Sequence, residues 1–210
     1  MSVQTELHYV AYLKSAWGPA TPMFTGAGDI RRMKEDNIKQ DAEGLPDRAE
    51  ILRIAKVTNK TLLDIGTGPL SIIAARDFNC RVTNIDISAE ALSAAAMEVK
   101  REGLDHKISL AKEDAANLPY PDSTFHTVIS YGALHHNPAD TREKVAHEAY
   151  RVAEKQIIIA ELSEAGFNQL HGYSGFVAVD LNWLEEILNS LGKVKRYSSK
   201  MMNVYICIKR

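Results

Sequence analysis

From Thr61 to the end of the chain, short runs of β-branched and apolar residues alternate with segments whose apolar residues repeat at helical spacing. This alternation predicts strands at residues 61–65, 81–85, 107–110, 127–131 and 156–161, with helices between them. Strands that alternate with helices are typical of a mainly parallel sheet covered on both faces. We therefore expect an α/β, doubly wound, Rossmann-like fold.

The C-terminal segment departs from this alternation. A helix-period run that includes Leu184, Leu188 and Leu191 ends at Gly192, where we expect a helix C-cap with positive φ. Residues 193–198 and 203–208 then read as two strands, and the loop between them is too short for a helix. This last pair should therefore be antiparallel.

Composition sets limits on class and location. A chain of 210 residues with a formal charge of −2 has no global positive field for nucleic acid. It contains no apolar run of membrane-span length and no signal-peptide stretch, so we expect a cytoplasmic protein that binds neither membrane nor nucleic acid. Cys80 and Cys207 are too few for a disulfide framework or a thiol-rich metal site.

The first 45 residues differ from the rest of the chain in composition. Aromatic residues, among them Tyr9 and Trp17, are scattered between glycines and prolines, and a strongly charged stretch follows. This segment is either a lid over a binding site or a helix docked on the sheet or on a second subunit. We expect one domain at residues 46–210 with this N-terminal appendage, and a homodimer is possible.

The segment around residues 62–70 is the most informative. An apolar strand ends in Asp64 and Ile65 and runs into a turn, Gly66-Thr67-Gly68, that opens a helix. The two glycines permit a tight turn and a close backbone approach, and the helix N-terminus offers amides to an anion. By itself such a turn can also merely connect a strand to a helix.

A carboxylate at the end of the next strand sharpens the interpretation. Asp86 follows Gly66 by about 20 residues, the spacing at which an acidic side chain accepts the hydroxyls of a ribose. The structural alternative is that Asp86 caps the helix that begins near Ser88. Together, the turn and the acid predict an adenosine site for either a nicotinamide dinucleotide or S-adenosylmethionine.

A third element distinguishes the two cofactors. After the third strand, Asp114 can accept from an adenine amino group while the Ala115 amide meets a ring nitrogen, and Leu118-Pro119-Tyr120 follows. With residues 64–68, Asp86-Ile87-Ser88 and Ala133-Leu134-His135-His136, the sequence resembles the class I S-adenosylmethionine-dependent methyltransferases, in particular the ubiquinone/menaquinone-biosynthesis-like branch (methyltransferase type 11).

The resemblance implies a seven-stranded sheet whose last strand is antiparallel. It also implies residue roles. Asp64 and the turn of Gly66, Thr67 and Gly68 would bind the methionyl part of the cofactor, and Asp86 would bind the ribose. Ile87 would cover one face of the adenine, Asp114 and Ala115 would bind the adenine edge, and Tyr131 would lie near the sulfonium. Where the family usually has a third glycine this chain has Leu70, which could weaken cofactor affinity.

The expected reaction is in-line displacement of the methyl group by a nucleophile of a small-molecule acceptor, for which alignment matters more than a base. His135, and second His136, could take a proton from a phenol or hydroxyl, or could simply cap the next helix or line the pocket. A metal site of His135, His136 and Asp140 is disfavoured because adjacent histidines at a strand end tend to diverge, so no metal is expected.

Phe167, His171 and Tyr173 lie among glycines after the fifth strand and suit either a mobile pocket cover or an ordinary surface loop. With Tyr9 and Trp17 they would form a pocket for a small, partly apolar or planar acceptor. Two other functions stay open from the sequence: a non-catalytic S-adenosylmethionine or S-adenosylhomocysteine-binding subunit, and a nicotinamide-dependent oxidoreductase, which would leave Asp114 unexplained.

Overall fold

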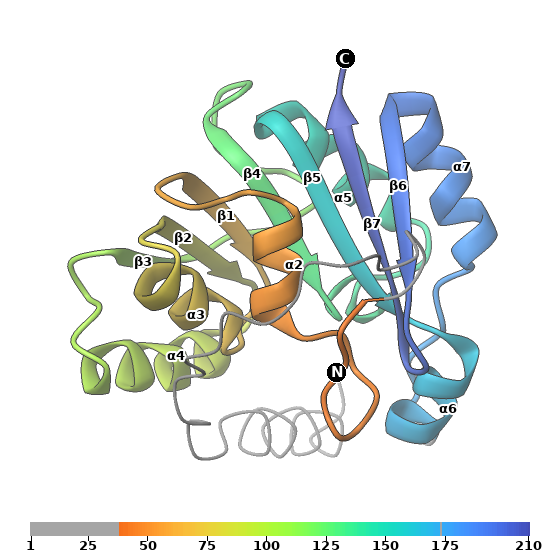
Figure 1. The fold of residues 1–210 in the computed structure, drawn as a ribbon, viewed down its shortest axis with the longest axis horizontal. Coiled ribbons are helices and arrows are strands. Elements are labelled where there is room, and N and C mark those ends of the chain that lie inside the picture. The colour runs from red at the N-terminus through yellow and green to blue at the C-terminus, as the bar shows by residue number, and fades with distance from the viewer. Residues whose placement is uncertain (1–37, 173) are drawn as a thin grey trace, which may run out of the picture.

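The computed structural model describes residues 38–172 and 174–210. A seven-stranded sheet in the order β3-β2-β1-β4-β5-β7-β6 forms its centre (Figure 1). In chain order the strands are β1 (Thr61–Ile65), β2 (Arg81–Asp86), β3 (Ile108–Lys112), β4 (Phe125–Tyr131), β5 (Ala153–Leu162), β6 (Gly192–Ser198) and β7 (Met202–Lys209). β7 is antiparallel to both neighbours and all other pairs are parallel, which confirms the predicted fold class.

Helices lie on both faces of this sheet. They are α2 (Arg48–Ile54), α3 (Leu70–Asp77), α4 (Ala89–Arg101), α5 (Arg142–Val152), α6 (Glu164–His171) and α7 (Leu181–Leu191), with a short 3-10 helix, η1 (Leu134–His136). Figure 1 shows α2 and α3 in front of the sheet and α5 behind it. Successive strand residues face opposite sides, so Leu62 packs with α2 and α3 while Leu63 packs with α5 and α7.

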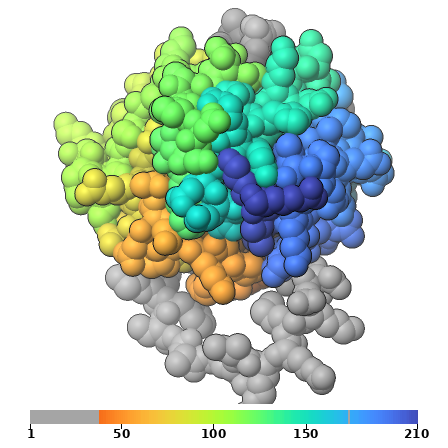
Figure 2. All heavy atoms as spheres, turned by 90° about the horizontal axis from the view of Figure 1, so that it is seen from above, coloured from red at the N-terminus to blue at the C-terminus, as the bar shows by residue number. Residues whose placement is uncertain are grey.

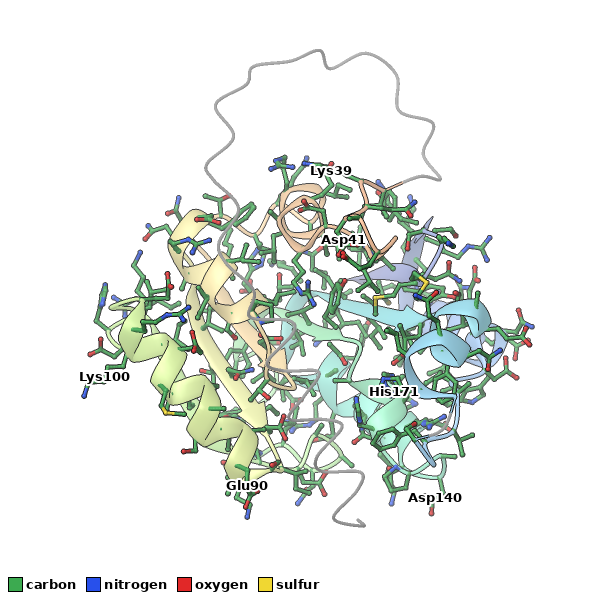
Figure 3. The ribbon with its side chains drawn as sticks, turned by 90° about the horizontal axis from the view of Figure 1, so that it is seen from below. Lys39, Asp41, Glu90, Lys100, Asp140 and His171 are labelled. Carbon is green, nitrogen blue, oxygen red and sulfur yellow. The ribbon has the colours of Figure 1, made fainter. Side chains whose placement is uncertain are left out.

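The parallel strands end together at one edge of the sheet, the position at which open α/β sheets bind ligands. Figure 3 looks at this edge from below. Figure 2 looks at the opposite edge, where the dark-blue end of the chain lies against teal residues. There Lys209 Nζ donates to the carbonyl oxygen of Ala153 at 2.7 Å, which joins the end of β7 to the start of β5.

The expected positive-φ cap at Gly192 is wrong. Gly192 has φ −153° and is the first residue of β6, directly after α7. A Cβ atom there would lie 2.4 Å from the carbonyl oxygen of Ile208 and 2.7 Å from Cys207 Sγ. Glycine is therefore required by the close approach of β7, because a side chain would collide with the neighbouring strand.

The segment before α2 packs on the end of the β6–β7 hairpin. Ile38 is buried in the core, and the Gly44 carbonyl accepts from the Met201 amide at 3.2 Å and from Ser199 Oγ at 3.1 Å. Residues 38–46 are thus docked on the sheet. Tyr9, Trp17 and Tyr173 lie outside the described residues. Within the described residues, no helix has the length and apolar character that a membrane crossing requires.

Candidate nucleotide and acceptor site

The turn after β1 is built for close approach. Gly66 has φ +92°, and its amide donates to the Ile85 carbonyl on β2 at 2.8 Å. A Cβ atom on Gly66 would lie 2.8 Å from Ala133 Cβ, whereas a Cβ atom on Gly68 would meet none of the described residues within 4 Å. Gly66 is therefore required by backbone conformation and packing, while no described residue crowds the backbone at Gly68.

Asp86 ties the end of β2 to this turn. Its Oδ2 accepts from the Thr67 amide at 3.0 Å and from Thr67 Oγ1 at 3.3 Å, and its Oδ1 accepts from the Ser88 amide at 2.9 Å. Ser88 itself caps α4, because its Oγ accepts from the Ala91 amide. The alternative in which Asp86 is the helix cap is therefore wrong, and the carboxylate stands beside the glycine turn.

Asn84 is a structural member of this site that the sequence did not suggest. Its Nδ2 donates to the carbonyl of Asp64 at 3.0 Å and to the carbonyl of Gly66 at 2.7 Å. The Asn84 side chain is buried, so a single amide satisfies two carbonyls of the turn. It fixes the turn in place before any ligand arrives.

Next to Asp86, the side chain of Ile87 is 63% exposed. A large aliphatic group held in solvent at the end of β2 offers an apolar surface to a flat ring. One strand further out, Asp114 Oδ1 accepts from the Ala116 amide at 2.8 Å, so the loop of Asp114 and Ala115 is a fixed turn at the same edge. The ribose and adenine roles of these residues stay predictions.

Asp64 lies under the turn rather than in it. Its side chain is buried, and its Oδ2 accepts from Ser71 Oγ at 2.5 Å. Burial raises the pKa of Asp64 to about 7, against the opposing effect of the Ser71 hydrogen bond. Leu70, which stands where the resemblance expects glycine, is 2% exposed and belongs to the core beside α2, so the core accommodates its side chain.

Tyr131, at the end of β4, contacts the segment that precedes α2 and the first residue of that helix. Its hydroxyl donates to the Pro46 carbonyl at 3.0 Å, and the Arg48 guanidinium lies 4.2 Å from the ring centroid. The predicted place of Tyr131 near a sulfonium is not tested by these contacts, which fix its side chain against residues 46–48.

A cluster of three histidines lies beyond the end of β4. His135 and His136 belong to η1, and His171 is the last residue of α6. The centroid of the His135 ring is 4.2 Å from that of His136 and 4.7 Å from that of His171. One ligand nitrogen of each residue lies within 4.8 Å of the other two.

The expectation that the adjacent histidines diverge is wrong, because they lie in a 3-10 helix and not on an extended strand. Asp140 is exposed and does not belong to the cluster; His171 stands there instead, and Figure 3 shows Asp140 further out at the rim than His171. Burial, followed by the neighbouring His135, lowers the pKa of His136 to about 2 and that of His171 to about 4. Both rings are therefore neutral at physiological pH.

Glu161, at the end of β5, orients His135. Its Oε1 lies 2.7 Å from His135 Nδ1 and accepts from the Leu162 amide, and its Oε2 accepts from the His135 amide at 3.2 Å. Both side chains are buried. A carboxylate on Nδ1 puts the imidazole proton there and leaves the lone pair on Nε2.

Arg142 holds the loops around this cluster together. Its buried guanidinium donates to the carbonyls of Asn137 and His135 on one side and of Val177 and Ala178 on the other. Phe167 and Phe176 lie edge-on to the histidine rings, with Phe176 4.4 Å from His136 between centroids. Of the predicted acceptor pocket, the structure thus brings Phe167 and His171 to His135 and His136.

Sequence reasoning assigned no role to Glu161 or Arg142. The sequence carried one signal for Glu161: it is an acidic residue at the end of the otherwise apolar strand predicted at residues 156–161. The histidine pair follows the preceding predicted strand, residues 127–131. Arg142 gave no such signal, since a basic residue in the first turn of a helix is ordinarily solvated.

Comparison with known proteins is consistent with this geometry. A family model described as a methyltransferase domain matches residues 63–156. Norajmaline N-methyltransferase of Rauvolfia serpentina is 33% identical over 127 residues, 57% of this chain and 43% of that protein. Demethylmenaquinone methyltransferase of Bacteroides fragilis is 31% identical over 102 residues, 47% of this chain and 40% of that protein. The chain thus spans less than half the length of these relatives.

Solved structures agree on the fold. Magnesium protoporphyrin IX methyltransferase from Synechocystis PCC 6803, solved with S-adenosylmethionine bound, has a TM-score of 0.61 at 16% identity and covers 78% of this chain and 76% of its own. An S-adenosylmethionine-dependent methyltransferase from Aquifex aeolicus has a TM-score of 0.60 at 20% identity and covers 78% and 90%.

The order of the strands defines a Rossmann-like sheet, and the glycine turn lies at its carboxyl edge. Residues 63–156 match a methyltransferase domain, and the relatives of similar sequence are methyltransferases. The chain is therefore similar to the S-adenosylmethionine-dependent methyltransferases in this region and in its fold.

Proposed function

We propose that this chain transfers the methyl group of S-adenosylmethionine to a small-molecule acceptor. The observation that carries the proposal is the grouping of Asp86, exposed Ile87 and open Gly68 around one turn. These residues fit a ribose, an adenine face and a backbone contact, respectively. Two relatives named for norajmaline and demethylmenaquinone support a small-molecule acceptor.

S-adenosylmethionine supplies an already activated methyl group, so the chain's own task is alignment. Asn84 and Asp86 fix the turn and the carboxylate before binding, which lowers the entropic cost of ordering the site. Correct alignment and exclusion of water are worth up to about 7–11 kcal/mol in favourable cases. Proton transfer by His135 or His136 remains a prediction.

Four further predictions belong to this proposal. The segment of residues 1–45 is a lid over the site or a docking segment, and Tyr9, Trp17 and Tyr173 complete an acceptor pocket with Phe167 and His171. The protein works in the cytoplasm, without nucleic acid or membrane. It forms a homodimer, which light scattering of the purified chain would test.

The function is tested by incubating the chain with S-adenosylmethionine and separate pools of amines, phenols and quinols, and measuring S-adenosylhomocysteine. We expect product that depends on one acceptor class and is lost in Asp86→Ala. Nucleotide binding without turnover on any class would instead indicate a non-catalytic binding subunit.

A further inference from the structure

We infer that His135, His136 and His171 form a binding site for a divalent first-row transition metal, with Zn²⁺ as the type case. The three residues come from two elements: η1, which follows β4, and the end of α6, which follows β5. Their ligand nitrogens lie within 4.8 Å of one another. Around a tetrahedral metal with bonds of about 2.0–2.1 Å, such nitrogens are roughly 3.3 Å apart. Small ring rotations therefore close the site.

His135 supplies the strongest argument. Its side chain is 2% exposed, and its Nδ1 is engaged by Glu161 Oε1 at 2.7 Å. Its Nε2 is buried and has no hydrogen-bond partner among the described residues. An unpaired buried nitrogen costs about 1–3 kcal/mol, and a metal ion at the centre of the cluster would remove that cost.

The Glu161–His135 pair is also the arrangement that surrounds metal-bound histidines. A carboxylate that accepts from one ring nitrogen fixes the tautomer and raises the basicity of the other nitrogen. The Leu162 and His135 amides donate to the same carboxylate, which fixes it in position. Glu161 thus acts as a positioning residue for His135.

A tetrahedral metal held by these three imidazoles has one coordination position left for a further ligand. Phe167 and Phe176 pack edge-on against the histidine rings, and Arg142 clamps the backbone of His135 through its carbonyl. The ligand set contains imidazoles and no thiolate, which suits Zn²⁺, Fe²⁺, Co²⁺ or Ni²⁺ rather than Mg²⁺. Three ligands with a fourth position open are typical of a metal that contacts a substrate.

The site adjoins the nucleotide turn. Ala133, two residues before His135, is the residue that a Cβ atom on Gly66 would touch. An oxygen or nitrogen of an acceptor could therefore fill the open position while it faces the turn; this last step rests on the proposed function.

The test uses the full chain, free of any affinity tag that contains histidine, after treatment with a chelator. Zn²⁺ is titrated calorimetrically, and Co²⁺ is titrated by its visible absorption. We expect one ion per chain with a dissociation constant at or below micromolar, a Co²⁺ spectrum of four-coordinate intensity, and a higher unfolding temperature with metal.

Two substitutions test the ligands and one serves as control. His171→Phe keeps an aromatic ring in the cluster and should weaken binding at least 100-fold; Glu161→Gln should weaken it 10- to 100-fold. His147 lies exposed on α5 beside Glu143, so His147→Ala should leave binding unchanged. Each variant is checked for cooperative unfolding and for S-adenosylhomocysteine binding.

Absence of tight binding in folded wild-type protein would overturn the inference. So would binding that survives His171→Phe or disappears in His147→Ala, since the ion would then sit on the surface. Because nucleotide binding is measured on the same samples, a failed metal site and a failed proposed function give different results.

Discussion

Asp86 accepts two hydrogen bonds from Thr67. The backbone amide and the hydroxyl of Thr67 donate to the same carboxylate oxygen of Asp86, at 3.0 and 3.3 Å. The residue predicted to bind a ribose therefore also sets the shape of the glycine turn that precedes it. One carboxylate links two strand ends, so the nucleotide site is largely formed without ligand.

The two glycines of this turn should respond differently to alanine. Gly66→Ala should destabilise the protein by about 1–3 kcal/mol, because φ is +92° and Ala133 blocks the new Cβ atom. Gly68→Ala should change stability by less than about 0.5 kcal/mol yet weaken S-adenosylhomocysteine binding, because its Cβ atom would fill open space at the site. Urea unfolding and calorimetry on both variants check this pair. Equal destabilisation by both would contradict the geometry.

Ile87 offers a second test of the adenine position. Ile87→Ser should weaken S-adenosylhomocysteine binding several-fold with little effect on stability, because the side chain is 63% exposed without ligand. Met97, 66% exposed in the middle of α4, provides a matched control, and Met97→Ser should leave affinity unchanged. The adenine assignment fails if both substitutions have the same effect on affinity.

Arg142 should be a major determinant of stability around the histidine cluster. Arg142→Met leaves the carbonyls of Asn137, His135, Val177 and Ala178 without their donor and should cost about 2–4 kcal/mol. The control is Arg196→Met, which breaks an exposed pair with Glu185 and should cost less than about 1 kcal/mol. Chemical denaturation separates the two cases, and a cost for Arg142→Met as small as that of the control would show that these hydrogen bonds contribute little.

Asp64 should make stability depend on pH. Its pKa is raised from 3.8 to about 7 in the folded protein, so folding favours its protonated form. The contribution is complete below about pH 4 and is lost as pH rises through about 7, which amounts to on the order of 2–4 kcal/mol.

His136 acts in the opposite direction, since its lowered pKa stabilises the protein as pH rises. The measurement is therefore the difference in unfolding free energy between wild type and Asp64→Asn from pH 4 to 8. We expect the unfolding free energy of the wild type, minus that of Asp64→Asn, to fall as pH rises, because only the wild type has to ionise a buried carboxyl group. A difference that is constant with pH would mean that Asp64 has an ordinary pKa.

The strands and the nucleotide turn could be predicted because their signals are local. β1 is predicted with its observed bounds, Thr61–Ile65, since a β-branched and aliphatic run meets a glycine turn there. β5 begins three residues before its predicted start, at Ala153, because pairing with Phe125 on β4 extends it. In the sequence Ala153 lies at helical spacing from Ala146 and Ala149, so local apolar periodicity does not reveal the start of this strand.

The histidine cluster depends on a contact that no local pattern contains. His171 lies 36 residues after His135 and reaches it from a different helix, and Glu161 reaches it from the neighbouring strand. The sequence suggested His135, His136 and His171 separately, but not that they meet. Their convergence follows from β4 and β5 pairing in parallel, which brings both following segments to the same edge.

The central claim is tested most directly by calorimetric titration of the purified chain with S-adenosylhomocysteine, beside Asp86→Ala and a separate titration with NADH. The account predicts micromolar binding to the wild type, at least tenfold weaker binding to Asp86→Ala, and no tight binding of NADH. Absence of S-adenosylhomocysteine binding in folded protein, or equal affinity in the variant, would contradict it.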